Sequence, residues 1–111
     1  MMNEIKQISS LQNPLVKKVL LLMGKSRQRK KDGLFVLEGQ RELELALKVG
    51  YEIQTLFFND SIISEQDAVT ALVGLATQPA MISVSKEVYQ KLAYRETTEG
   101  ILAIVKSKPH H

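Results

Sequence analysis

The chain has 111 residues, of which 44% are hydrophobic, and this is enough for one domain with a buried core. It contains no cysteine, which excludes disulfide bonds and thiolate metal sites and is compatible with a cytoplasmic location. Eight of the fifteen Lys and Arg residues lie in the first 31 positions beside a single acid, so this segment carries +7 and residues 32–111 carry −4. Such asymmetry is typical of proteins that bind nucleic acids.

The sequence predicts neither a membrane-spanning segment nor a metal site. The longest apolar run, residues 19–23, is too short to span a membrane, and the start of the chain lacks the apolar stretch of a signal peptide. The only histidines are His110 and His111, a candidate remnant of an expression tag. We therefore predict no metal site.

The first predicted element is a helix that begins at Asn13 and Pro14, because asparagine is a favoured cap and proline suits the first helical position. Apolar residues at helical spacing then form one face, made of Leu15, Val16, Val19, Leu20, Leu22 and Met23. Gly24 either bends this helix or ends its first half. The basic run at residues 25–31 lies on the last turns or just beyond them.

Strand and helix patterns alternate along the rest of the chain. Short apolar runs predict strands over residues 34–37, 53–58, 81–84 and 101–105. A helix with Leu43, Ala46 and Leu47 on its inner face follows the first strand and ends at Gly50. Ser85 caps a short helix before the last strand.

The helix between the second and third strands begins at Ser64, whose hydroxyl can cap it. Its predicted inner face consists of Ala68, Val69, Leu72, Leu75 and Ala76. Strands that are joined through helices favour a three-layer α/β/α sandwich around a small mixed four-stranded sheet. We expect one domain over residues 1–109, with the N-terminal basic helix as a flank outside the α/β body.

Three segments together resemble a known family. Residues 9–14 read SSLQNP, residues 33–41 after the basic run read GLFVLEGQR, and residues 100–105 read GILAIV. In this order and spacing they resemble the N-terminal substrate-binding domain of SpoU/TrmH-type RNA ribose 2′-O-methyltransferases, and the resemblance covers nearly the whole chain.

The resemblance implies a fold related to kink-turn-binding ribosomal proteins. It also implies a parent enzyme with a C-terminal knotted domain, absent from this chain, that binds S-adenosylmethionine and forms a homodimer. The catalytic residues of the family have no matching positions here, and no glycine-rich cradle follows a strand. We therefore predict no catalytic and no cofactor-binding residue in this chain, which alone should be inactive.

The basic residues are the first candidates for RNA contact. Arg27, Arg29, Lys30 and Lys31 could bind phosphate groups, and Lys17 and Lys18 could extend the same surface. The alternative is a solvated helix end, where cations interact favourably with the helix dipole. Replacing the four residues at 27, 29, 30 and 31 by alanine is expected to weaken RNA binding with little loss of stability.

Two polar segments are further candidates. Gly39, Gln40 and Arg41 follow the first predicted strand, at the sheet edge where α/β proteins usually bind ligands, and the equivalent turn of the kink-turn binders touches RNA. The alternative is a capping turn in which Arg41 pairs with Glu44. Arg95, Thr97 and Thr98 precede the last strand and could donate to phosphate or ribose, or form only a solvated loop.

The leading hypothesis is an RNA-binding domain that delivers rRNA or tRNA to the methyltransferase domain of a longer protein. One alternative is a free-standing structured-RNA-binding or ribosome-associated module without an enzyme. Another is that the basic flank is a surface for docking another protein or another part of the same protein.

Overall fold

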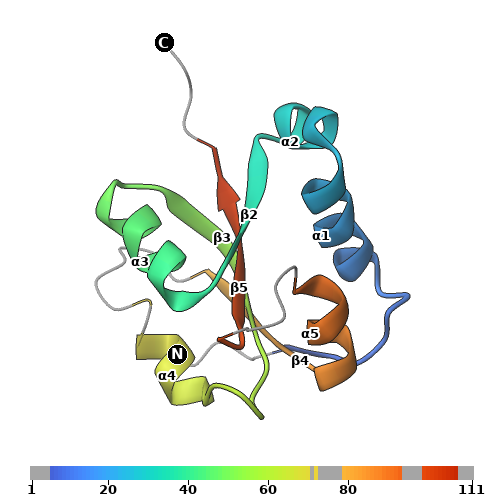
Figure 1. The fold of residues 1–111 in the computed structure, drawn as a ribbon, viewed down its shortest axis with the longest axis vertical. Helices are drawn as coiled ribbons and strands as arrows, with labels where there is room; N and C mark the ends of the chain where they lie inside the picture. The colour runs from blue at the N-terminus through green and yellow to red at the C-terminus, as the bar shows by residue number, and fades with distance from the viewer. Residues whose placement is uncertain (1–5, 71, 73–78, 94–98, 108–111) are drawn as a thin grey trace.

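The computed structural model describes residues 6–70, 72, 79–93 and 99–107, and its centre is one mixed sheet of five strands (Figure 1). The strands are β1 (Lys6–Ile8), β2 (Leu34–Glu38), β3 (Glu52–Phe58), β4 (Ala80–Val84) and β5 (Ile101–Lys106). They lie in the order β1-β4-β3-β5-β2. β1, β4 and β3 are parallel, whereas β5 runs antiparallel to both β3 and β2. β2 is therefore an edge strand.

Helices cover both faces of this sheet (Figure 1). They are α1 (Pro14–Gly24), α2 (Ser26–Asp32), α3 (Gln40–Lys48), α4 (Glu65–Thr70) and α5 (Lys86–Leu92). α1 and α5 pack on one face, where Val19 and Leu22 meet Leu92 and the strand residues Phe57 and Ile104. α3 and α4 pack on the other face.

The strands supply two apolar clusters because successive side chains point to opposite faces. In β5, Leu102 and Ile104 belong to the cluster under α1 and α5, while Ile101, Ala103 and Val105 belong to the cluster under α3 and α4. All five are at most 1% exposed. β5 is thus buried on both faces, as expected for a strand inside a sheet with helices on each side.

Local capping signals are confirmed. The Asn13 side chain accepts a hydrogen bond from the Leu15 N–H at 2.8 Å, and the Ser85 hydroxyl accepts one from the Val88 N–H at 3.2 Å. The Ser64 hydroxyl accepts one from the Asp67 N–H at 3.0 Å, just before α4. Each cap satisfies an amide that has no partner within its helix.

Of the two possibilities for Gly24, the second is confirmed: α1 ends there, and the basic run forms a separate helix, α2. Two other sequence-based expectations are corrected. The sheet has five strands and not four, because the three-residue β1 pairs with β4 and is too short to show a periodic pattern. Val69 was expected inside but is 39% exposed, whereas Ala68 and Leu72 are buried. Leu75 and Ala76 lie outside the described residues.

Candidate nucleic-acid interface

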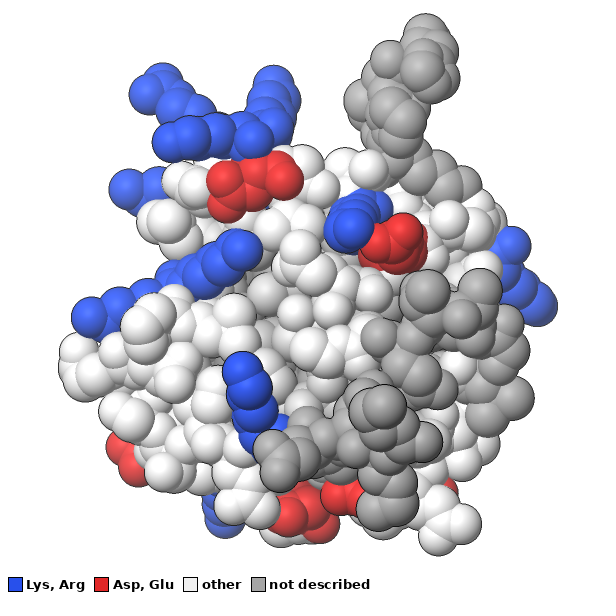
Figure 2. Space-filling model, turned by 180° about the vertical axis from the view of Figure 1, so that it is seen from behind, with Lys and Arg blue, Asp and Glu red and all other residues white. Residues whose placement is uncertain are grey.

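The basic run forms a short helix with no buried residue. Lys25 ends α1 with an extended backbone (φ −132°), and its N–H donates to the Leu21 carbonyl. α2 ends at Gly33, whose φ of 66° is in the left-handed region that glycine adopts without strain. Arg27, Lys30 and Lys31 are exposed along this helix. Figure 2 shows Lys and Arg side chains gathered at the corner of the molecule formed by α1 and α2.

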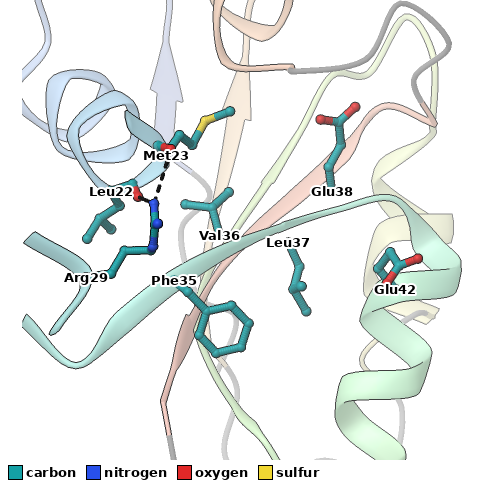
Figure 3. A pocket seen from close by; sticks show the side chains of 8 residues that line it. All are labelled: Leu22, Met23, Arg29, Phe35, Val36, Leu37, Glu38 and Glu42. Atoms are coloured by element: carbon teal, nitrogen blue, oxygen red, sulfur yellow. Dashed lines mark hydrogen bonds between the residues drawn. The ribbon is translucent and has the colours of Figure 1, made fainter. Parts of the chain in front are cut away.

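Arg29 differs from its neighbours because its guanidinium group is bound within the protein. One guanidinium nitrogen donates to the Leu22 carbonyl at 2.7 Å and to the Met23 carbonyl at 3.2 Å (Figure 3). These carbonyls belong to the last turn of α1, which leaves them without partners inside that helix. Arg29 therefore fixes α2 against the end of α1. The positive charge of its guanidinium group interacts favourably with the C-terminal end of the α1 dipole, and not with the end of α2, the helix to which Arg29 belongs.

The two lysines of α1 lie off its buried stripe. Lys17 is exposed and Lys18 is half-buried, while Val16, Val19 and Leu22 face the core. The part of the chain that the structure describes contains one acid on α2, Asp32, whose carboxylate accepts a hydrogen bond from the Gln28 side chain at 2.8 Å. The surface of α1 and α2 is thus predominantly cationic.

The turn from β2 to α3 is closed by an acidic side chain. Gly39 has φ 100° and ψ 151°, and its N–H donates to the Ile101 carbonyl at 3.0 Å. The next amide, that of Gln40, donates to the Glu99 carboxylate at 2.9 Å. A φ of 100° is rarely adopted by residues with a Cβ atom, and a Cβ atom there would also displace the Glu99 carboxylate from its position. Arg41 is exposed, and these described residues include no ion pair between Arg41 and Glu44.

The two candidate surfaces lie at opposite ends of β2. Arg27, Lys30 and Lys31 precede the strand, and Gly39 to Arg41 follow it, about 17 Å away for five residues of extended chain. A groove of about 440 Å³ runs between the ends (Figure 3). It is lined by Leu22, Met23, Arg29, Phe35, Val36, Leu37, Glu38 and Glu42.

Sequence reasoning missed Glu99 and the internal role of Arg29. Glu99 lies 59 residues from its partner amide, so only the pairing of β2 with β5 brings them together. The candidates Arg95, Thr97 and Thr98 lie outside the described residues. Within the described ranges there is no cluster of three or more His, Cys, Asp or Glu side chains suited to a metal, and no helix long and apolar enough to cross a membrane.

Comparison with protein families gives a match that includes both candidate surfaces. The model of the MRM3-like substrate binding domain matches residues 13–103. The chain belongs to this family. A search of curated proteins found no match.

Solved structures support the assignment of the fold. An rRNA methyltransferase from Sinorhizobium meliloti is 23% identical with a TM-score of 0.75, over 96% of this chain and 38% of that one. A structure described as an RNA 2′-O ribose methyltransferase is 28% identical with a TM-score of 0.75, over 95% of this chain and 39% of that one.

The SpoU methyltransferase AviRb from Streptomyces viridochromogenes, solved with AdoMet, is 20% identical with a TM-score of 0.74, over 88% of this chain and 37% of that one. This member of the MRM3-like family therefore spans little more than a third of the length of these enzymes.

Proposed function

We propose that this chain is the RNA-binding part of a SpoU-type ribose 2′-O-methyltransferase and holds its rRNA or tRNA substrate through the surface of α1 and α2. The observation that carries the proposal is the exposed cationic helix α2 within a family described as substrate-binding. Its three exposed cations can neutralise phosphates and release the counterions condensed on RNA. Such contacts give affinity without reading the bases.

Arg27, Lys30 and Lys31 are assigned the main phosphate contacts, because all three are exposed on one short helix. Arg29 is assigned to support this helix, since its donors already serve the α1 carbonyls. Lys17 and Lys18 extend the surface along α1.

Gly39, Gln40 and Arg41 are a second point of contact at the far end of β2. There Arg41 supplies the charge, and the Glu99 carboxylate already takes the Gln40 amide. Arg95, Thr97 and Thr98 stay part of the proposal as donors to phosphate or ribose.

The chemistry of methyl transfer belongs, in this proposal, to the part of the longer protein that this chain does not include. That part would bind S-adenosylmethionine, which supplies the methyl group, and would form the homodimer. This chain would contribute affinity and orientation of the RNA, so that the target ribose reaches the other domain. A cytoplasmic location belongs to the same proposal.

The test is a titration of the chain with structured rRNA fragments and tRNA at low and moderate salt. The variant R27A/K30A/K31A is compared with K48A/K86A/K91A, which removes the same charge from exposed lysines of α3 and α5. We expect the first variant to bind more weakly, and the slope of log K against log salt concentration to flatten by about 2–3 units, at ~0.7–0.9 for each of the three lost phosphate contacts. Equal effects of the two variants would show that only net charge matters and would refute the assignment to α2.

A further inference from the structure

The free edge of β2 presents regularly spaced hydrogen-bonding groups. The hydrogen bonds that flank β2 fix its pattern: the Gly39 N–H donates to the Ile101 carbonyl at 3.0 Å, and the Ser107 N–H donates to the Gly33 carbonyl at 2.8 Å. Because hydrogen-bonded residues alternate along an antiparallel pair, Phe35 and Leu37 are the residues of β2 that bond to β5. In an antiparallel pair the intervening residues direct their N–H and C=O groups away from the neighbouring strand. Leu34 and Val36 therefore direct theirs toward the open edge, where no described strand lies.

Apolar side chains border this edge on both faces of the sheet. Phe35, Val36 and Leu37 are only half-buried, although they lie in the middle of a strand. A second hollow of about 350 Å³ lies on the α3 side, where Leu45 is 50% and Val49 57% exposed. Edge strands of monomeric proteins commonly carry charged residues, Pro or a bulge that blocks pairing. Residues 34–37 include no charged residue and no proline, the β2–β5 register is unbroken, and the one charge of β2 is Glu38 at its end.

Charges at the two ends of the groove have opposite sign. Arg29 lines the end near the start of β2, and Glu38 and Glu42 line the end where β2 passes into α3 (Figure 3). If a second, identical strand lies antiparallel along the edge, the basic end of each copy meets the acidic end of the other. A parallel strand would instead bring like charges together.

We propose that β2 is a self-association edge, which pairs antiparallel with β2 of a second copy of this chain. The register is centred on Val36, so that Val36 lies opposite Val36 of the second copy and Leu34 lies opposite Glu38. The two sheets then form one continuous sheet across a two-fold axis. This surface does not depend on the proposed RNA contacts of Arg27, Lys30 and Lys31.

Sedimentation of the RNA-free chain from about 10 µM to about 1 mM tests the proposal, because pairing through one five-residue strand is expected to give weak association. V36P removes an N–H that points to the open edge and leaves the β2–β5 hydrogen bonds in place, as proline on an edge strand can. V36A removes more of the side chain than V36P does but keeps the N–H, so it controls for the loss of apolar contact. We expect the wild type and V36A to dimerise and V36P to stay monomeric. A wild type that is monomeric throughout, or a V36P dimer as tight as that of V36A, overturns the proposal.

If V36P does not fold, a second pair of variants tests the antiparallel pairing of β2. E42K reverses a charge in the groove, whereas E44K makes the same change at an exposed position of α3 that does not line it. We expect E42K to weaken dimerisation about tenfold or more and E44K to leave it within about twofold of the wild type. Equal dissociation constants for the two variants would contradict the proposed pairing.

Discussion

Replacing Arg29 by methionine should destabilise the protein, although Arg29 lies in the helix to which we assign RNA binding. Methionine keeps an unbranched side chain of comparable length but removes both hydrogen bonds to the Leu22 and Met23 carbonyls, which lie at 2.7 and 3.2 Å from one guanidinium nitrogen. Hydrogen bonds from a charged donor contribute about 1.5–3 kcal/mol each when they are fully buried. Because Arg29 is half-buried and water can replace part of the interaction, we expect a loss of about 1–2 kcal/mol in the free energy of unfolding.

For a domain of this size, that loss corresponds to a fall in Tm of about 4–8 °C. Thermal and urea unfolding followed by circular dichroism would measure it. R27M is the matched control, because Arg27 is exposed on the same helix and its replacement should cost less than ~0.5 kcal/mol. The variant in which residues 27, 29, 30 and 31 all become alanine should therefore lose stability, contrary to the expectation from the sequence. If R29M and R27M unfold at the same temperature, the assignment of Arg29 as a support for α1 is wrong.

Two further predictions concern the loops at the ends of the strands. Gly39→Ala should lower the free energy of unfolding by about 1–3 kcal/mol, because φ 100° and ψ 151° are accessible essentially to glycine alone and the Glu99 carboxylate fills the space for a Cβ atom. G33N, at φ 66° with open space around it, should cost less than half as much in urea unfolding. Asn59→Ala should cost about 2 kcal/mol by the same assay, since the buried Asn59 amide donates to the Val84 carbonyl at 2.8 Å; an unchanged unfolding midpoint would contradict that role.

The parts of the fold that depend on neighbouring residues could be predicted from the sequence. The caps at Asn13 and Ser85 bond to amides two and three residues away, so their signals lie within a few positions of the chain. The strands of the sheet interior are also visible as apolar runs, because β5 is buried on both faces. These signals account for the mixed α/β class and for the approximate bounds of α1, α3 and α5.

The parts that depend on distant partners could not be predicted. β1 has three residues and no distinctive pattern, and its strand conformation follows from its pairing with Ile82 to Val84 of β4. Arg29 and Glu99 look like ordinary surface charges in the sequence. Their partners, the carbonyls at the end of α1 and the amide of Gln40, become visible only when α2 and β5 are in place. The assignment of individual residues to RNA contacts likewise stays a prediction, because the partner of each residue lies outside the chain.

The most direct test of the proposed RNA surface is to record amide NMR spectra of the chain while a structured rRNA fragment is added. We expect the largest shifts for the amides of α2 and the first half of α1, with smaller shifts at the turn that contains Gly39 and Gln40. Shifts confined to α4, α5 and the β1 edge of the sheet, or none at RNA concentrations that saturate binding, would contradict the central claim that α2 holds the RNA.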